Sequence, residues 1–469
     1  MSQKGIITVW VLVFGAVFLI LLAGILGYLA FQIKQNQRVL ARDEALHIAE
    51  AGINYARWHL AHSPEDFGFS GTYDYKDPEG TVVGQYQLVI TGPTGCDQAV
   101  KIKSLGWKLN SENLGREVLV TYAKPSLAKY AFLTNSSVWF GEDEELKGPF
   151  HSNGGIRMDG LQNSLSTSAR ESYICGPEHG CSASSCSDPC AWTVSGCECP
   201  GIWGEGEGGE RGLWQFPVSN VDFDKITQDL ATLKEEAKNS GIYIGSPTRH
   251  GYHLTFKADG TVDVYTVTRL KRKVWGYDGE GWVYESNSID REQFFANYAL
   301  PSNCAPIFVE NNVWVDGDVK GKVTLVAGKL PETAASMKKI IIWGNINYVD
   351  NDSVLGLIAQ KDILIPLYSP NNLEVKAAML AQKGHVFRYY YPKWWFEPYR
   401  TYAIRDYIET YGSIITNTMW TFTWVDAKGN VVSGYRETEM SYNPDLTYHP
   451  PPYFPVSGEY EIVSWEEVD

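Results

Sequence analysis

The chain has 469 residues, enough for two or three domains or for one elongated domain with appendages. Its 44% hydrophobic content excludes a wholly disordered chain, and abundant Gly (44), Tyr (28) and Trp (16) favour a turn-rich β protein over a helical bundle. The 40 basic and 55 acidic residues give a net charge of −15, which argues against a nucleic-acid partner because neutralising phosphates requires a positive surface.

An apolar segment near the N-terminus predicts a membrane-spanning helix. Residues 6–31 contain no charged side chain, and about 26 helical residues are enough to cross a bilayer core of roughly 30 Å. The segment is too long for the apolar region of a secretory signal, and no small-residue cleavage site follows it. By itself, the segment is typical of an ordinary signal anchor.

The helical pattern continues beyond the apolar segment. From Val39 to about Leu60 the apolar residues recur at helical spacing with charged residues off that face, and Pro64 ends the pattern. The recurring apolar positions are Leu46, Ala49, Ile53 and Ala56. We therefore predict one helix over residues 6–63, apolar all round at first and amphipathic later, which suits insertion into a bundle of similar helices.

Two motifs flank the apolar segment: Lys4-Gly5 precedes it, and Ala49, Glu50, Ala51 and Gly52 follow in the amphipathic half. Together they resemble the N-terminal region of PilX-like minor pilins, a family of type IV pilus assembly. The resemblance implies that a prepilin peptidase cuts after Gly5, so that residues 1–5 are a leader and the mature chain begins at Ile6.

The same resemblance implies where the protein lies and what it contacts. Its partners would be membrane lipid, the prepilin peptidase and other pilin subunits, which pack through the N-terminal helix into a type IV pilus-like filament. The chain would cross the bacterial inner (cytoplasmic) membrane once. Its bulk would be extracytoplasmic, on a pilus or at the cell surface.

The sequence departs from the pilin pattern at Trp10. Major pilins carry a glutamate at this position, where it pairs with the N-terminus of a neighbouring subunit, and a subunit at the filament tip would not need that ion pair. Lys4 precedes the apolar segment, whereas Lys34, Arg38 and Arg42 follow it. This charge distribution alone favours the opposite orientation, so the predicted topology depends on the resemblance.

The rest of the chain predicts β structure in three parts. Residues 66–125 form a small β region around a turn at 92–95. Residues 131–416 contain short β-branched runs separated by Gly and Asn, with few hairpin signals, which favours the stacked rungs of a parallel β-solenoid. A β-sandwich is the alternative. The aromatic and Pro-rich residues 417–469 are predicted to strap the open end of the solenoid.

Four segments of this β region resemble an uncharacterised domain that follows PilX-type N-termini in bacterial surface proteins. They are residues 308–317, 344–348, 355–360 and 411–415. The resemblance implies an envelope location and supplies no catalytic residue. The predicted fold class is therefore mainly β, with a long transmembrane and amphipathic helix and a parallel β-solenoid-like extracellular domain.

Residues 170–300 are predicted to hold insertions in the solenoid. An amphipathic helix extends from Phe223 to Ala237 after a plausible N-cap at Asp222, and a hairpin extends from Leu254 to Tyr265. The remaining insertion contains six cysteines: Cys175, Cys181, Cys186, Cys190, Cys197 and Cys199.

These cysteines predict a disulfide-stapled loop, because the bulk of the chain is expected outside the membrane. With Cys96 and Cys304 the total is eight, and the connectivity stays open. A zinc site formed by four thiolates, or by thiolates and His179, is the alternative, although no Cys-x2-Cys pair is present.

Several polar motifs favour solvated loops over active sites. Gly204, Gly206 and Gly209 match a dinucleotide-binding pattern, but no helix follows them and the intervening glutamates would repel a pyrophosphate. Carboxylates recur at 142–145, at Asp316 and Asp318, and at Asp350 and Asp352. Paired acids also occur in solenoid glycan-active enzymes and in calcium sites. We expect no enzymatic activity, no cofactor and no metal site.

Two further surface motifs are a basic run and an aromatic run. Arg269, Lys271, Arg272 and Lys273 predict a solvated hairpin edge rather than a DNA groove. The aromatic run comprises Tyr389, Tyr390, Tyr391, Trp394, Trp395, Phe396 and Tyr399. Its rings either cover the flank of the solenoid or form an exposed platform, centred on Tyr390, Trp394 and Trp395, that binds a glycan or another protein.

Together these features predict a membrane-anchored minor pilin-like subunit. A domain of some 400 residues on one helix would crowd a filament shaft, so we expect a role at the tip or in priming and assembly, with adhesion through the aromatic surface. One alternative is a bitopic surface protein outside any filament. Another is an anchored glycan-active β-solenoid enzyme, which would need paired carboxylates about 5–10 Å apart.

Overall fold

The computed structural model describes residues 4–94, 99–142, 144–204, 211–223, 230–245, 249–394, 396–426, 429–456 and 460–468. The chain forms two compact units. The first comprises Met1–Pro93, Ala99–Ala123 and Glu459–Asp469, and the second comprises Thr94–Gln98 and Lys124–Gly458.

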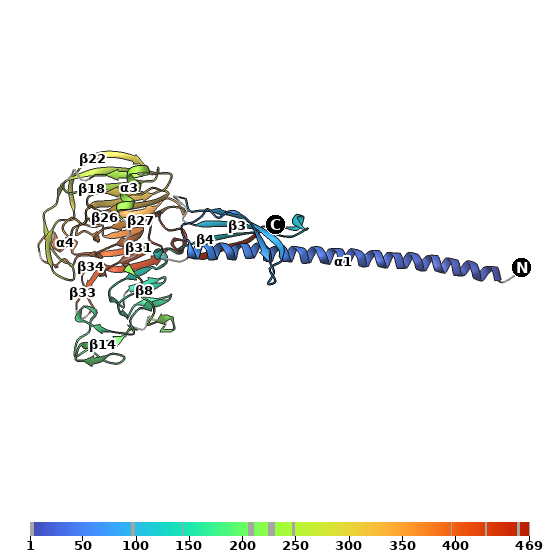
Figure 1. The fold of residues 1–469 in the computed structure, drawn as a ribbon. Coiled ribbons are helices and arrows are strands. Elements are labelled where there is room, and N and C mark those ends of the chain that lie inside the picture. Colours follow the sequence, from blue (N-terminus) through green and yellow to red (C-terminus); the bar gives the residue numbers. More distant parts are fainter. Residues whose placement is uncertain are drawn as a thin grey trace. The chain divides into compact units, whose positions relative to one another are not determined.

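The first unit is a long helix against an antiparallel sheet (Figure 1). Its elements are α1 (Lys4–His62), β1 (Gly71–Lys76), β2 (Val82–Thr91), β3 (Val100–Lys108), β4 (Arg116–Ala123) and β35 (Glu461–Val468). The strand order is β1-β2-β3-β4-β35, and every neighbouring pair is antiparallel. Because β35 comes from the C-terminal end, the chain between β4 and β35 is an insertion into this sheet.

The two halves of α1 have different surroundings within this unit. From Val9 to Leu40 its large apolar side chains are exposed, and this part of the helix is long and apolar enough to cross a membrane. From Ala45 to Leu60 one face is buried against the inward side chains of β2, β3 and β4. The predicted change from a helix that is apolar all round to an amphipathic one is confirmed.

The second unit is a parallel β-solenoid with three faces, as the ladders of parallel strands show. The first face contains β17 (Ile242–Ile244), β23 (Ile307–Val309), β25 (Lys322–Ala327), β27 (Val354–Ala359), β29 (Asn372–Ala381), β31 (Ile404–Thr416), β5 (Phe132–Thr134), β8 (Phe150–Ser152), β11 (Ser166–Ser168) and β16 (Trp214–Gln215), in that order.

The second face begins with β18 (Tyr252–Lys257), β24 (Val313–Val319), β26 (Ile340–Tyr348), β28 (Ile363–Ile365), β30 (Val386–Arg388) and β32 (Trp420–Thr421). A separate parallel sheet holds β6 (Val138–Phe140), β9 (Ile156–Met158) and β15 (Ile202–Trp203). The third face contains the later parts of β24 and β26 and the earlier parts of β29 and β31. It continues with β34 (Val431–Tyr442), β7 (Glu144–Lys147) and β10 (Leu161–Gln162).

The core consists of columns of apolar side chains that repeat from rung to rung. One column on the first face runs in register through Ile307, Leu325, Leu357, Met379, Ile414, Phe132 and Phe150, all of them buried. Stacking like residues in this way explains why short β-branched runs are sufficient for each rung. The predicted parallel solenoid is therefore confirmed, and the β-sandwich alternative is wrong.

Glycines form tight corners between two faces. At Gly317, where β24 bends, φ is +106°, and an added Cβ would lie 2.2 Å from the carbonyl oxygen of Phe256. At Gly412, in β31, φ is +147°, and a Cβ would lie 2.2 Å from the carbonyl oxygen of Ala377. Only glycine fits such positions, so the sequence Asp316-Gly317-Asp318 forms a corner of the solenoid.

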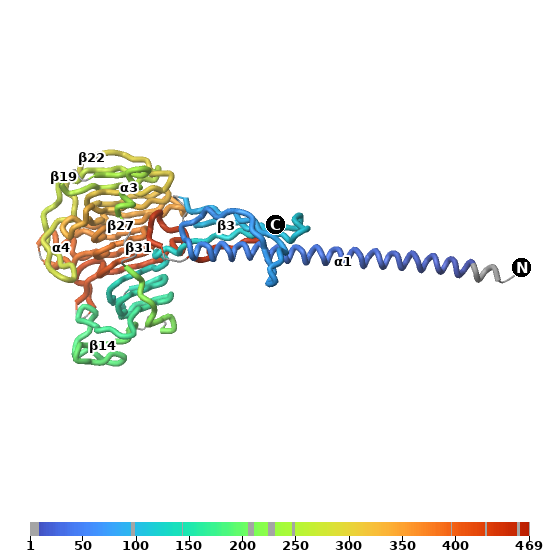
Figure 2. The backbone as a smooth tube through the Cα atoms, viewed as in Figure 1, coloured from blue at the N-terminus to red at the C-terminus, as the bar shows by residue number. Residues whose placement is uncertain are grey.

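The rungs do not follow chain order, because the chain enters and leaves near the middle of the solenoid. Strand β31 pairs with β5, and β34 pairs with β7. In Figure 2 the part around β14 and the part around β22 lie at opposite ends of this unit, with the orange and red rungs between them. The entering and leaving segments meet in a bridge between Ser126 and Val456. Ends that lie together allow a domain to be inserted into a host sheet.

The C-terminal segment differs from the predicted strap over 417–469. Within it, β34 is a full solenoid strand, β33 (Thr423–Val425) pairs with β34, and β35 belongs to the sheet of the first unit. Only residues 443–456 cover the solenoid, where Leu446 and Phe454 are buried against its first face. Strand β34 has charged outward side chains, such as Glu437 and Glu439, and lacks the apolar run that marks the other rungs in the sequence.

The predicted insertions are also present. Helix α3 (Leu230–Ser240) follows residues 224–229, which lie outside the described residues. Strands β18 and β19 (Thr261–Leu270) form the predicted hairpin, and β22 (Ile289–Ala299) pairs with β19. A second hairpin joins β20 (Val274–Tyr277) and β21 (Trp282–Glu285). The short helix α4 (Tyr399–Tyr402) begins at the last residue of the aromatic run.

Candidate functional site

The helix motif at residues 49–52 is a packing site. A Cβ added to Gly106 on β3 would lie 2.2 Å from the backbone nitrogen of Ala49, so helix and strand are in direct backbone contact. A Cβ on Gly52 would lie 2.3 Å from the hydroxyl oxygen of Ser104, which itself donates a hydrogen bond of 2.8 Å to the carbonyl of Ala49. Small residues at these positions allow the close approach.

The other two members of the helix motif, Glu50 and Ala51, lie nearer the surface. Glu50 and Ala51 are partly exposed, and Glu50 contacts the His47 ring at 3.3 Å. The backbones of Gly5 and Ile6 lie at the start of α1. Cleavage between them stays a prediction.

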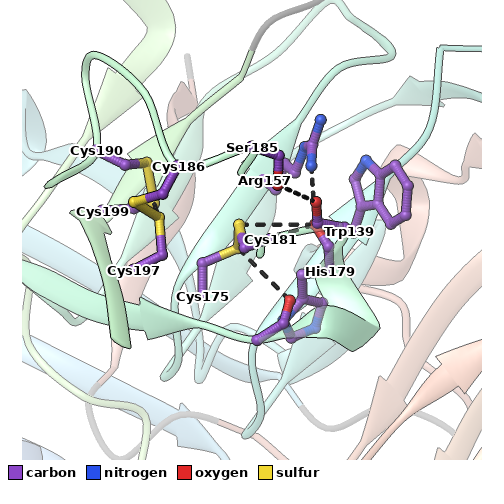
Figure 3. Close-up of a disulfide and its surroundings, with 12 residues drawn as sticks. Trp139, Arg157, Cys175, His179, Cys181, Ser185, Cys186, Cys190, Cys197 and Cys199 are labelled. Carbon is purple, nitrogen blue, oxygen red and sulfur yellow. Dashed lines mark hydrogen bonds between the residues drawn. A yellow bond between two sulfur atoms is a disulfide. The ribbon is translucent and has the colours of Figure 1, made fainter. Parts of the chain in front are cut away.

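The cysteine-rich insertion folds as a small lobe held by disulfides (Figure 3). Its strands β12 (Ser172–Cys175), β13 (Ala191–Thr193) and β14 (Gly196–Pro200) form an antiparallel sheet in the order β12-β14-β13. The disulfides pair Cys175 with Cys181, Cys186 with Cys197, and Cys190 with Cys199. The lobe's buried cluster consists of these cysteines with Tyr173 and Trp203, so disulfides take the place of a larger apolar core.

The predicted disulfide-stapled loop is confirmed, and its connectivity is now assigned. Sulfur atoms from different disulfides lie close together, but each is in a disulfide and so is not a free thiolate for zinc. Beside the lobe, the Arg157 guanidinium lies 4.7 Å from the Trp139 ring and 4.9 Å from the Trp203 ring. Cys304 is also disulfide-bonded, whereas Cys96 lies outside the described residues.

The carboxylate motifs have local partners in the structure. Asp318 accepts a hydrogen bond from Asn347 at 3.5 Å, and Asp350 accepts one from Ser353 at 2.6 Å. Glu144 accepts a hydrogen bond from the backbone of its own turn, and Asp352 is exposed. Asp143 and residues 205–210, which include Gly206 and Gly209, lie outside the described residues.

Asp316 belongs to an ionic cluster around the buried His253, which the sequence did not predict. The His253 ring on β18 lies 3.3 Å from Asp316 and 2.9 Å from Glu292. Burial alone would lower the pKa of His253, but the hydrogen bonds and charges of the two carboxylates outweigh it and raise the pKa to about 9. The imidazolium therefore joins β18, β24 and β22 as a charged, buried link.

A cavity of about 770 Å³ lies where the basic run meets the aromatic run, and we call it the aromatic groove. Its walls include Arg272, Lys273, Trp275, Trp394, Phe396 and Tyr399. The volume is within the range of about 300–1,000 Å³ that is usual for ligand sites. Two motifs more than 100 residues apart in the sequence thus line one concave surface.

The aromatic run divides into a buried and an exposed part. Tyr389, Tyr391 and Tyr399 are at most 4% exposed and cover the solenoid flank, as the structural interpretation predicted. Trp394 (38% exposed) and Phe396 (43%) face the aromatic groove. Tyr390 is partly buried outside the lining of that groove, and its backbone pairs with Tyr277 of β20. Trp395 lies outside the described residues.

The rings of the aromatic groove hold one another in place. The Trp394 ring lies 5.2 Å from that of Phe396 and 4.7 Å from that of Tyr399. The opposite wall is built by the β20–β21 hairpin, where the rings of Trp275 and Tyr284 are 5.0 Å apart. The backbone nitrogen of Trp275 donates a 2.6 Å hydrogen bond to the Tyr399 hydroxyl, which joins the two walls.

A buried ionic network anchors the β20–β21 hairpin. The Lys339 ammonium lies 3.2 Å from Glu285 of β21 and 3.5 Å from Asp362. Burial would raise the pKa of Asp362, but hydrogen bonding from His385 and the charge of Lys339 lower it to about 2. Glu285 also accepts a 2.6 Å hydrogen bond from the Tyr389 hydroxyl. The buried tyrosines thus support the groove from beneath.

The basic run lies at the exposed end of the hairpin strand β19, and part of it also lines the aromatic groove. Arg269, at the end of β19, pairs with Asp290. The Lys271 ammonium lies 4.7 Å above the Tyr368 ring, and Arg272 and Lys273 are exposed at the aromatic groove. No pattern in the sequence points to Trp275, Tyr284 or Tyr368 as groove residues, because nothing in their spacing connects them to the aromatic run.

Comparisons with known proteins add little. No family model matches the chain, and no curated protein matches it. Among solved structures, the chain is similar to the crystal structure of the competence-associated pilin ComZ from Thermus thermophilus, with 14% identity over 91% of this chain and 97% of that chain. The TM-score is 0.29, which is too low to carry an inference about fold or function. The PilX-like resemblance stays a prediction.

Proposed function

We propose that the protein is a membrane-anchored subunit of a type IV pilus-like filament that presents its solenoid outside the cell. The observation that carries the proposal is the division of α1. Its first half is apolar on all sides and exposed, and its second half is buried on a small antiparallel sheet. A helix that is apolar all round needs either lipid or other apolar helices around it. A filament subunit is surrounded by lipid before assembly and by the helices of other subunits afterwards.

The insertion of the solenoid supports a place at the filament tip or in its priming. The solenoid interrupts the sheet of the first unit between β4 and β35, so every copy of the helix carries a domain of more than 300 residues. Repeated incorporation along a shaft would crowd these domains. We propose a structural and adhesive role that needs no catalysis, at the surface of a bacterial cell or on its pilus.

Photo-crosslinking from the exposed half of α1 tests the proposal against a simple anchor. We would place a photoreactive amino acid at Leu29, which is 46% exposed on α1, in cells that produce the protein. The matched control carries the same amino acid at Val349, which is 43% exposed on the solenoid.

The proposal predicts a crosslink from position 29 to a second pilin subunit, recovered with filaments sheared from the cells. The control should give no such product. A chain that stays with the membrane and crosslinks at position 29 only to lipid would contradict the proposal and favour a bitopic surface protein.

A further inference from the structure

We infer that the aromatic groove binds a short acidic oligosaccharide, one whose sugar rings carry carboxylates. Four large aromatic side chains in and beside the groove are between 38% and 43% exposed: Trp275, Tyr284, Trp394 and Phe396. Exposed aromatic surface in a concave site usually marks a binding surface.

The rings are arranged before any ligand arrives. Trp394 is held between Phe396 and Tyr399, and Trp275 is fixed to Tyr399 through its backbone hydrogen bond. The hairpin wall is anchored by the buried network around Lys339. Rigid aromatic walls lose little conformational entropy on binding. They offer flat apolar faces on which the C–H face of a pyranose ring can stack.

Two cations at the groove select the charge of the ligand. Among the described residues, neither Arg272 nor Lys273 forms a salt bridge, and both are exposed at the groove. The nearby Arg269 and Arg400 are instead paired with Asp290 and Glu397. Lys273 lies 5.9 Å above the Tyr284 ring. On a chain of net charge −15, two cations without a salt bridge to any described residue, beside stacked rings, are a local positive site. An Arg guanidinium matches a carboxylate in bidentate geometry.

Nucleic acid fits the groove less well than a glycan. Single-stranded nucleic acid also stacks on aromatic rings, but it requires a positive track that follows a phosphate at every nucleotide. The groove offers only Arg272 and Lys273 as cations that form no salt bridge with a described residue, and Glu397 is part of its lining. A short sugar chain with two or three carboxylates needs no such track.

The test measures binding of the purified full-length protein in detergent to trigalacturonate. The neutral counterpart is the methyl ester of the same trisaccharide, and a thymidine oligonucleotide is the polyanion control. The variants are Trp394→Ala, to remove one ring, and the double variant Arg272→Gln/Lys273→Gln, to remove the cations. Matched controls are Trp192→Ala in the disulfide lobe (57% exposed) and Lys320→Gln, an exposed lysine outside the groove lining.

The inference predicts that trigalacturonate binds more tightly than its methyl ester, and that the double variant loses about tenfold or more in affinity and most of the preference for the acid. Trp394→Ala should weaken binding of both sugars, and the two controls should bind as the unaltered protein does. The inference is overturned if the oligonucleotide binds more tightly than trigalacturonate, if trigalacturonate does not bind, or if the controls lose affinity equally.

The biological role of this binding depends on the proposed function, but the measurement does not. A protein that binds the acid and never enters a filament would refute the proposed function alone. A protein that enters filaments and does not bind the acid would refute the groove inference alone.

Discussion

Replacing Gly106 by alanine should destabilise the first unit strongly, because the new methyl group has no space. Its Cβ would lie 2.2 Å from the backbone nitrogen of Ala49, 2.5 Å from the carbonyl oxygen of Ala45 and 2.8 Å from the Cα of Ala49. All three are backbone atoms, so no side-chain rotation relieves the overlap. The helix must move away from β3 as a whole.

The expected cost follows from two contributions. Overpacking a tight contact costs about 1–3 kcal/mol. Moving the helix also stretches the buried hydrogen bond from Ser104 to the carbonyl of Ala49, which is worth about 1 kcal/mol. We expect Gly106→Ala to reduce the free energy of unfolding of this unit by about 2–4 kcal/mol.

Hydrogen exchange of the β3 amides in the purified full-length protein measures this loss without interference from the solenoid. Gly27→Ala is the matched control, because nothing lies within 4 Å of a Cβ at Gly27. Alanine there should stabilise the helix by about 0.5–1 kcal/mol. Unchanged exchange in Gly106→Ala would show that the helix does not contact β3 as described.

Three further predictions concern the second unit. The pKa of His253 is raised in the folded protein to about 9, so its charged form contributes about 3 kcal/mol of stability, which is fully present below pH 6.5 and lost as the pH rises through 9. The free energies of unfolding of the unaltered protein and of His253→Gln, measured with denaturant, should therefore differ at pH 6 and converge at pH 10. A difference that stays constant with pH would contradict the assignment. Lys339→Met removes the buried cation that Glu285 and Asp362 share and should cost about 3–5 kcal/mol in thermal or denaturant unfolding, whereas an unchanged midpoint would argue against the buried network. Reduction of the three disulfides of the cysteine-rich lobe should lower the stability of the lobe by about 2–3 kcal/mol for each loop that a disulfide closes. Residues 172–200 should then become accessible to protease while the solenoid rungs stay folded. Equal protease resistance with and without reductant would contradict the stabilising role of these disulfides.

The parts of the fold that the sequence predicted are those encoded by local patterns. Helix α1 follows from an uninterrupted helical periodicity that ends at Pro64, and the solenoid follows from short β-branched runs with glycine corners. The small residues Ala49 and Gly52 stood out in the sequence, and the structure supplies the reason, which is the approach of the helix to β3.

The parts that the sequence did not predict depend on contacts between distant segments. Nothing local indicates that β31 pairs with β5, or that β35 returns to the first sheet, so the C-terminal region was interpreted as a strap. The aromatic groove forms because the β20–β21 hairpin docks beside the aromatic run, through contacts such as Glu285 with Lys339 and Trp275 with Tyr399. The basic and aromatic runs were each visible in the sequence, but their meeting was not.

The mass and the first residue of the mature protein, purified from its native membrane, test the filament account most directly. The account predicts a chain that begins at Ile6, with or without an added N-methyl group, because a prepilin peptidase would have removed residues 1–5. A chain that still begins at Met1 or Ser2 would contradict the account and leave α1 as a simple membrane anchor.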